Sequence, residues 1–243
     1  MKRYLPFLII AGVLIIAVVA GMALWKSSKQ AQEQPAGQQF AQSTPQASPS
    51  QVAQATQTPA ATPPVQLPPD NPHARGGPNA KVTLDEYGDY QCPPCGALYP
   101  ELKTLEKDYG DQVRFVFHQF PLQTVHKHAE LAAHAAEAAA LQGHFWEMHD
   151  MLYQNQLSWS VAEDARPVFI QYARMLGLDV DRFTRDLDGY EVKSRVDTDI
   201  ERGKSLGVQG TPTVFINGRQ LKPEVMTDDG LRMALDYMLG KKK

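Results

Sequence analysis

Hydrophobic and polar positions follow three different patterns along the chain. Residues 5–25 form one apolar run without a charged side chain, and residues 30–69 consist almost wholly of Gln, Ala, Pro, Ser and Thr. Apolar residues recur with the periods of strands and helices only from about residue 72 onward. The chain therefore divides into a hydrophobic segment, a low-complexity segment and a domain that can form a core.

The apolar run predicts a transmembrane helix. At about 1.5 Å per helical residue, residues 5–25 span about 30 Å, the thickness of the apolar core of a bilayer. Trp25 and Lys26 stand where an interfacial aromatic ring and a cation are expected. A cleaved signal peptide is the alternative, although its apolar region usually has about 7–15 residues. We expect residues 1–26 to be a cytoplasmic N-terminus and an uncleaved anchor, and Gly21-Met22-Ala23 leaves cleavage open.

Residues 27–71 are predicted to be a disordered linker. A segment so poor in large apolar side chains cannot bury enough area to offset the loss of conformational entropy on folding. As a flexible chain, its ends would lie about 35–40 Å apart. The folded domain is then expected to occupy residues 72–243.

The domain opens with the pattern of a strand, a helix and a second strand. Residues 81–87 alternate between apolar and polar, and a helical stripe follows the sequence Cys92-Pro93-Pro94-Cys95. Residues 113–117 have the composition of a second strand. This order predicts a βαβ unit with the cysteines at the junction of strand and helix.

Glu86 is the unusual residue of the first strand. The alternation places it on the same face as Val82 and Leu84. On an apolar face its carboxyl should be desolvated, with a raised pKa, and able to exchange a proton with Cys95. An acid that merely caps the end of the strand is the alternative.

Helical periodicity dominates the sequence between the second strand and about residue 207. Three apolar stripes of helical spacing lie between residues 128 and 176, so we expect an all-helical insertion over about residues 122–192. The remaining elements are predicted as a strand at 213–216, a tight hairpin turn at Asn217-Gly218 and a last helix at 228–239.

Composition and charge exclude several classes of function. The 243 residues carry a net charge of −3, and the four basic residues before residue 30 leave the domain more acidic than the whole chain. The only basic run, Lys241–Lys243, is too short for a nucleic-acid surface. Two cysteines rule out a disulfide-dense scaffold and any site of four thiolates.

The Cys-x-x-Cys pair has three interpretations. A zinc site needs two more ligands, and the nearest histidine pair, His144 and His149, would lie about 140° apart around a helix. A purely structural disulfide closes so short a loop that it removes little entropy from the unfolded chain. A redox pair is favoured, because a helix N-terminus stabilises a thiolate at Cys92. Cys92 is then the exposed nucleophile and Cys95 the resolving thiol.

From about Asn79 to Leu239, the chain resembles the DsbA-type thiol–disulfide oxidoreductases of the thioredoxin fold, in the subset anchored by an N-terminal transmembrane helix. The motifs that carry the resemblance are Glu86, the active-site turn Asp89–Cys95, the helix proline Pro100 and the segment Gly210–Phe215. The resemblance implies an α/β thioredoxin fold with an all-helical insertion. It also implies a cis bond between Thr211 and Pro212, in a loop that faces the cysteines.

The same resemblance implies roles for individual residues. The expected catalytic residues are Cys92, Cys95, Glu86 and Pro212, and the expected substrate-binding residues are Thr211, Tyr90, Pro93 and Pro94. The dipeptide Pro93-Pro94 departs from the Pro-His of the best-known strong oxidants. Two prolines leave only the N–H groups of Cys95 and Gly96 to stabilise the Cys92 thiolate, so we expect a less acidic thiol than in those oxidants.

The predicted function is thiol–disulfide exchange with extracytoplasmic, cysteine-containing protein clients, as a dithiol oxidase that supports disulfide formation. A reductase or isomerase of the same fold is the alternative, as is a tethered, non-catalytic binding module. A further redox protein must reset the Cys92–Cys95 pair. We expect no metal, no organic cofactor and no nucleic-acid partner, and a single-pass protein of the cell membrane held through residues 5–25, with its domain on the periplasmic or outer side.

Several further polar residues are candidates for a functional site. His126, His128 and His134 resemble a metal cluster, but solvated histidines on a helix face are the favoured interpretation. Asp85 and Asp89 are likewise expected to be solvated.

Overall fold

The computed structural model describes residues 73–241. The predicted anchor (residues 1–26) and linker (residues 27–71) lie outside these described residues. Within residues 73–241, no helix is both long enough and apolar enough to cross a membrane. The described residues correspond to the predicted folded domain.

A five-stranded mixed sheet forms the centre of the domain, in the order β1-β3-β2-β4-β5. Its strands are β1 (Ala74–Gly76), β2 (Val82–Gly88), β3 (Val113–Gln119), β4 (Thr213–Ile216) and β5 (Arg219–Gln220). Strands β2 and β3 run parallel, whereas β4 runs antiparallel to β2. Glu86 is paired with Phe117 on one side and with Val214 on the other, so it lies in the middle of the sheet.

Helices make up most of the remaining structure. They are α2 (Pro93–Tyr109), α3 (Ala129–Ala140), α4 (Phe145–Gln154), α5 (Gln156–Trp159), α6 (Arg166–Met175), α7 (Val180–Asp186), α8 (Tyr190–Ser205) and α9 (Asp228–Met238), with 3-10 turns η1 (Gly110–Gln112) and η2 (Pro223–Val225). Strand β2, helix α2 and strand β3 form the predicted βαβ unit, with Pro100 inside one continuous helix.

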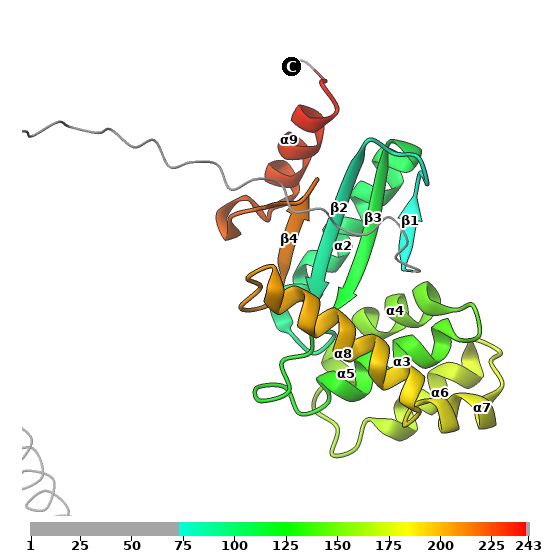
Figure 1. The fold of residues 1–243 in the computed structure, drawn as a ribbon. Coiled ribbons are helices and arrows are strands. Elements are labelled where there is room, and N and C mark those ends of the chain that lie inside the picture. Colours follow the sequence, from blue (N-terminus) through cyan, green and yellow to red (C-terminus); the bar gives the residue numbers. More distant parts are fainter. Residues whose placement is uncertain (1–72, 242–243) are drawn as a thin grey trace, which may run out of the picture. The chain divides into compact units, whose positions relative to one another are not determined.

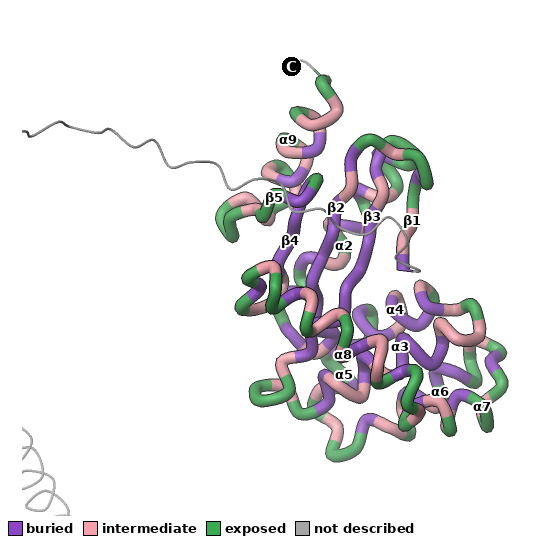
Figure 2. Tube along the Cα trace, in the orientation of Figure 1, coloured by how far each residue is buried: buried purple, intermediate pink, exposed green. Residues whose placement is uncertain are grey.

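Both faces of the sheet are covered (Figure 1). Helices α2 and α9 pack on the face that carries Leu84 and Val214, and α8 packs through Ile200 on the face that carries Tyr87. Figure 2 shows that β2, β3 and β4 are buried along most of their length. Strands covered on two sides lose the simple alternation of apolar and polar residues.

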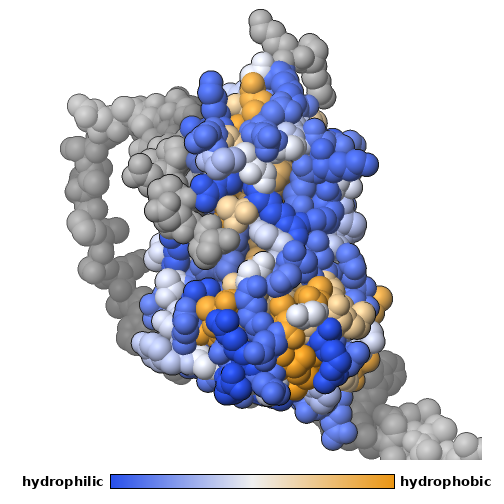
Figure 3. Space-filling model, turned by 90° about the vertical axis from the view of Figure 1, so that its right-hand side faces the viewer, coloured by the Kyte–Doolittle hydropathy of each residue, from blue (hydrophilic) through white to orange (hydrophobic). Residues whose placement is uncertain are grey.

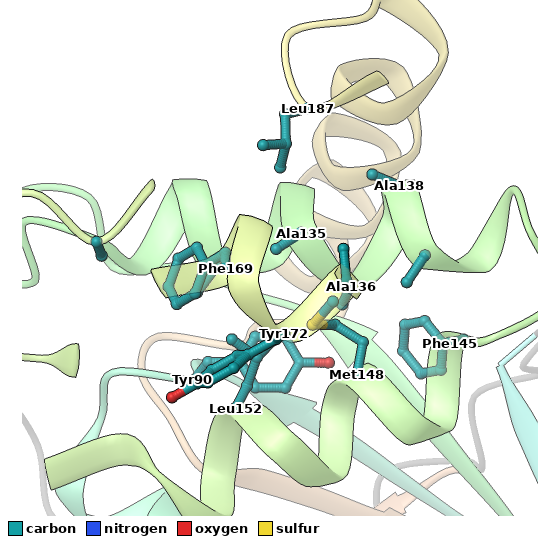
Figure 4. Packing of buried hydrophobic residues seen from close by; sticks show 14 of the residues in the cluster. Tyr90, Ala135, Ala136, Ala138, Phe145, Met148, Leu152, Phe169, Tyr172 and Leu187 are labelled. Carbon is teal, nitrogen blue, oxygen red and sulfur yellow. The ribbon is translucent and has the colours of Figure 1, made fainter. Parts of the chain in front are cut away.

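Helices α3–α7 lie beyond the carboxyl ends of β2 and β3 and form the expected helical insertion (Figure 1). Its core places the small side chains of Ala135 and Ala136 beside Met148, while Phe169 and Tyr172 of α6 pack into the same cluster (Figure 4). Small side chains on α3 let the neighbouring helices approach closely and pack without voids. Figure 3 shows that hydrophilic residues prevail over the upper part of one face, and the larger hydrophobic patches lie over the insertion.

The expectation that Asp85 is solvated was wrong. Asp85 is 2% exposed, because α8 covers this face of β2. His118 Nε2 lies 3.1 Å from Asp85 Oδ1, and His118 Nδ1 lies 3.4 Å from Asp199 Oδ1. Burial lowers the pKa of His118, but the hydrogen bonds to Asp199 and Asp85 outweigh it and leave the pKa raised. The aspartate is thus part of a buried polar cluster under α8.

Strand β1 was missed by the sequence analysis. It has only three residues, which is too few for an alternating pattern, and it pairs antiparallel with the edge of β3. Its position is fixed by Arg75, whose guanidinium lies 2.9 Å from Glu106 and 3.1 Å from Asp150 and stacks over Trp146. This ion-pair network joins the first strand to α2 and α4.

The predicted hairpin at the end of the sheet is confirmed. Asn217 and Gly218 both have positive φ, of 48° and 73°, as the tightest hairpin turns require. The Asn217 side chain accepts a hydrogen bond of 2.7 Å from the Thr83 N–H, so the turn is also tied to the neighbouring strand. Strand β4 pairs with β2, and the loop that precedes β4 lies against Cys92 at the start of α2.

Candidate active site

The two cysteines lie at the start of α2. Cys92 is the N-cap residue, with extended backbone, and Pro93 and Pro94 occupy the first two positions of the helix. Cys95, one turn further, is fully buried. Cys92 is 4% exposed, less than the predicted nucleophile should be, because the loop before β4 lies against it. The order of access agrees with the predicted roles: Cys92 is the sulfur nearer to solvent.

The predicted cis bond between Thr211 and Pro212 is confirmed, and the loop faces the cysteines. The Cys92 thiol donates a hydrogen bond of 3.3 Å to the carbonyl oxygen of Thr211. The hydroxyl of Thr211 is buried without a partner among the described residues. Segments 119 residues apart in the chain thus meet at one sulfur atom.

The two thiols have opposite pKa shifts. The pKa of Cys92 falls from 9.0 to about 6, chiefly because the Cys95 thiol donates a hydrogen bond to it, with a smaller contribution from the backbone N–H of Cys95. Burial acts against this shift. Burial is the main cause that raises the pKa of Cys95 well above 9, and the hydrogen bond to Cys92 and the charge of Glu86 add to it. Near neutral pH, Cys92 is therefore the thiolate and Cys95 the thiol.

This difference predicts the pH dependence of alkylation. In the reduced protein, the rate of reaction of Cys92 with iodoacetamide should rise with a midpoint near pH 6, because only the thiolate reacts. Cys95→Ala should move the midpoint upward, since it removes the strongest stabilising hydrogen bond. Alkylation rates from pH 4 to pH 9 measure both; a wild-type midpoint near pH 9 would contradict the assignment.

Only one of the two N–H groups that were predicted to stabilise the Cys92 thiolate does so. The Gly96 N–H donates to the carbonyl oxygen of Cys92 at 3.1 Å, as the first turn of a helix requires. It is therefore not directed at the sulfur. Among the expected backbone donors, only Cys95 lowers the pKa of Cys92.

Glu86 is buried behind the cysteine pair, as predicted. It is 5% exposed, and one of its carboxylate oxygens has no hydrogen-bond partner among the described residues. Burial raises its pKa to about 8, with smaller contributions from the charges of Glu106 and Cys92. A cavity of about 20 Å³, large enough for one water molecule, adjoins it and is also lined by Tyr99, Lys103 and His149.

Gln156 of α5 is a site residue that the sequence analysis missed. It is 7% exposed, and its side-chain amide donates hydrogen bonds of 2.8 Å to the carbonyl oxygens of Tyr90 and Cys92. A Cβ atom at Gly96 would overlap the Gln156 side-chain oxygen, so any larger residue there would have to displace this amide. The insertion thereby fixes the active-site turn. No local pattern reveals this role, because Gln156 lies 64 residues after Cys92.

The interpretation of Asp89, His126 and His128 as solvated residues was wrong. Asp89 is 1% exposed and accepts hydrogen bonds from the N–H groups of Gln91 and Leu122. His126 Nδ1 lies 2.7 Å from Asp89 Oδ2. His128 is 5% exposed, and its ring lies 2.8 Å from the Ala162 carbonyl. The contacts of His126 with Asp89 and of the His128 N–H with the Gln91 side chain hold the loop after β3 against the active-site turn.

The predicted substrate-binding residues do not all lie at the surface. Pro93 and Pro94 are exposed, whereas Tyr90 is 1% exposed and stacks on Phe117 at 5.1 Å between ring centroids. The Tyr90 side chain therefore packs beneath the cysteine turn, and the structure places it where no client can touch it without rearrangement. The backbone carbonyl of Tyr90 stabilises the turn by accepting a hydrogen bond from the Gln156 side chain.

Two hollows flank the cysteine turn. A groove of about 790 Å³ runs between α2 and the segment from Gly207 to Met226, and Pro94, Thr211 and Pro212 line it. A second depression of about 450 Å³ is lined by Pro93 and by residues 153–158 of the insertion. The two prolines of the motif thus face different sides of the site.

Together these features define a class of protein: a thioredoxin-like domain with a Cys-x-x-Cys pair at a helix N-terminus, opposite a cis-proline loop. A model of the family described as Thioredoxin matches residues 69–237. The chain therefore belongs to the thioredoxin family, and the predicted DsbA-type thiol–disulfide oxidoreductase fold with a helical insertion is confirmed.

Solved structures of similar fold support this assignment. BdbD from Bacillus subtilis in its oxidised form has 25% sequence identity and a TM-score of 0.61, over 69% of this chain and 92% of that one. DsbA2 of Pseudomonas aeruginosa has 26% identity and a TM-score of 0.55, over 72% of this chain and 97% of that one.

Sequence similarity also extends to part of a larger protein. The Na(+)/H(+) antiporter NhaA 3 of Salinispora tropica is 43% identical over 157 residues, which are 64% of this chain and 23% of the antiporter. The chain thus spans less than a quarter of the length of that relative. So partial a match does not by itself make ion transport a function of this chain.

Proposed function

We propose that the protein is a dithiol oxidase that transfers the Cys92–Cys95 disulfide to cysteine-containing protein clients outside the cytoplasm. The observation that carries this direction is the position of Cys92 as the N-cap residue of α2, where the Cys95 thiol and the Cys95 backbone N–H stabilise its thiolate and lower its pKa to about 6. Stabilising the thiolate stabilises the reduced form of the pair, and a disulfide with a stable reduced form is the stronger oxidant.

The reaction is two successive thiol–disulfide exchanges. A client thiolate attacks the Cys92 sulfur of the Cys92–Cys95 disulfide, a mixed disulfide forms, and Cys95 leaves with the electron pair of the broken bond. A second client thiolate then attacks the client sulfur of the mixed disulfide and expels the Cys92 thiolate. The client is oxidised to a disulfide, and the enzyme is reduced to the dithiol.

Glu86 fits the proton transfer in the first exchange. The departing Cys95 thiolate is basic, because burial keeps the pKa of Cys95 high, and it needs a proton. Glu86 lies close enough for its charge to raise that pKa and, with a pKa of about 8, still holds its proton at neutral pH. It is therefore the proton donor that we assign to this step.

The groove beside Pro94 is the surface that we assign to the client chain. Thr211 and Pro212 line it and lie against the Cys92 sulfur, so an extended segment in the groove would present its cysteine to the correct atom. Pro93 and Pro94, both exposed, border the path of the client. A separate redox protein would then reoxidise the Cys92–Cys95 pair.

The proposal includes a location. The uncharged apolar run over residues 5–25 supports an anchor in the cell membrane, and disulfide formation supports an oxidising compartment on its outer side. Protease added to spheroplasts should then release the domain in soluble form. A mature protein that begins near Leu24 and fractionates as soluble would replace the anchor by a cleaved signal peptide.

The reduction potential of the Cys92–Cys95 pair tests the direction. Equilibration of the purified protein with glutathione buffers should give a value above about −200 mV, in the range of oxidising members of this class. A value below about −250 mV would overturn the oxidase in favour of a reductase. Absence of thiol–disulfide exchange, together with a cellular function that is unchanged by loss of Cys92, would support the non-catalytic binding module instead.

A further inference from the structure

Glu101 is the only ionisable side chain that lines the groove beside the active-site turn, among the residues that the structure describes. The other lining residues are apolar or carry neutral polar groups, among them Ala97, Leu98 and Met226. A single carboxylate in an otherwise neutral groove sets the sign of the potential that an incoming chain meets.

The position of Glu101 along the groove follows from the helix. Pro94, Ala97 and Glu101 share one stripe of α2, at spacings of three and four residues. Glu101 is nine residues after Cys92, which is about 13 Å along the helix axis. An extended chain advances about 3.3 Å per residue, so a client residue three to four positions from the reacting cysteine would reach Glu101.

The Glu101 carboxylate has no partner within the described domain. One of its oxygens is buried and accepts no hydrogen bond, and no ion pair joins it to a base among residues 73–241. Glu106, five residues later on the same helix, accepts from both Arg75 and Lys103 at 2.9 Å. Asp108, the third acid of α2, pairs with Arg232 at 2.7 Å, so Glu101 is the one acid of this helix without a partner among the described residues, and it faces the groove.

A buried acceptor without a donor is unfavourable, and a cationic side chain from the client would supply the missing donor. We propose that Glu101 makes the enzyme prefer client segments that carry Lys or Arg three to four residues from the reacting cysteine. This inference rests on the proposed function and adds to it the chemical class of the preferred client. An acidic residue at the same place would be repelled.

Matched peptides test the preference. Three synthetic peptides, each with two cysteines, differ only in a Lys, Gln or Glu placed three and four residues from the first cysteine, on either side. The oxidised full chain should oxidise the Lys peptide about tenfold faster than the Glu peptide at low ionic strength, with the Gln peptide between them. The ratio should shrink at 0.5 M salt, because salt screens the attraction.

Two substitutions and a control assign the effect to Glu101. In Glu101→Gln the Lys-to-Glu ratio should fall to within about twofold of one, and in Glu101→Lys it should reverse. Asp111→Asn removes the same charge from an exposed site in η1, the turn that follows α2, and should keep the wild-type ratio. These comparisons within one enzyme do not depend on the absolute activity of each variant.

The outcomes separate this inference from the proposed function. Oxidation of dithiothreitol by the wild-type protein reports the proposed function alone, and its absence would overturn that function. If the wild-type protein oxidises dithiothreitol but oxidises the three peptides at equal rates, the role of Glu101 is overturned. A wild-type ratio that persists in Glu101→Gln would do so as well.

Discussion

Cys92→Ser is expected to reduce thiol–disulfide exchange by at least about 1,000-fold, with small dithiols and with protein clients alike. Cys92 is the thiolate of the pair, because Cys95 and the start of α2 stabilise its negative charge. Serine has a hydroxyl in place of the sulfur and can form no mixed disulfide. The rate of oxidation of dithiothreitol, followed as loss of free thiols, measures the change.

Cys95→Ser should trap clients, whereas Cys92→Ser should not react with them. The Cys92 thiolate remains and can attack a client disulfide, which forms a mixed disulfide and releases the client's other sulfur as a thiolate. Without Cys95 the variant has no thiol of its own to attack the Cys92 sulfur and release the client, so mixed disulfides should accumulate. Non-reducing gels of cells that express this variant should show adducts that disappear on reduction. Adducts that require Cys95 and persist without Cys92 would mean that the two roles are reversed.

The sequence was most informative where a local pattern coincided with a local cause. The helix start at Cys92 follows from two prolines after an extended residue, and the hairpin at Asn217-Gly218 follows from two residues that tolerate positive φ. Glu86 could be placed behind the cysteines because strand alternation put it on the face with Leu84. Each of these predictions needs only a few neighbouring residues.

The sequence failed where burial came from distant elements. Asp85 and Asp89 look like ordinary surface acids, but α8 covers Asp85, which pairs with His118 of β3. The loop after β3 covers Asp89 and supplies partners for it. The side chain of Gln156 serves carbonyl groups 64 and 66 residues earlier, in a turn that it contacts only in the folded chain. Single-sequence patterns contain no signal for such tertiary hydrogen bonds.

The two halves of the site differ in the same way. The chemistry of exchange lies in one motif, Cys92 to Cys95, which the sequence displays directly. In the proposed function, selection of clients depends on the groove, whose walls come from α2 and from a segment more than 100 residues later. Glu101 is conspicuous only once that second wall is in place, because an acid on a helix is by itself an ordinary surface residue.

Glu86→Gln is expected to change the pH dependence of stability. In the folded protein, burial raises the pKa of Glu86 to about 8, from 4.5 for an ordinary glutamate. Between these values the folded state keeps a proton that the unfolded state has released. The free energy of unfolding of the wild type must therefore fall as pH rises from about 4.5 to about 8, by about 3–5 kcal/mol in total. Glutamine has no proton to lose, so the variant lacks this fall.

The reduced proteins should accordingly have similar stability near pH 4.5, and the variant should be the more stable one by about 3–5 kcal/mol at pH 8.5. Cys92 acts in the opposite sense, since its lowered pKa adds stability as pH rises above about 6. Both proteins share this contribution, so it largely cancels when their free energies of unfolding are subtracted. Guanidinium unfolding at both pH values, with reductant present, measures the difference. Asp111→Asn, which removes an exposed charge, should differ from the wild type by a small, nearly constant amount.

The same variant should lose activity while it gains stability. Without the Glu86 proton, Cys95 must leave the disulfide as an unprotonated, buried thiolate, so formation of the mixed disulfide with a client should slow near pH 7. Stopped-flow mixing of oxidised protein with a single-cysteine peptide measures that step directly. Unfolding curves that shift equally with pH in both proteins would show that Glu86 does not hold its proton in the folded state, and an unchanged rate of mixed-disulfide formation would remove its assigned role as proton donor. A carboxyl that weakens the fold yet speeds the exchange is what a buried catalytic acid should be.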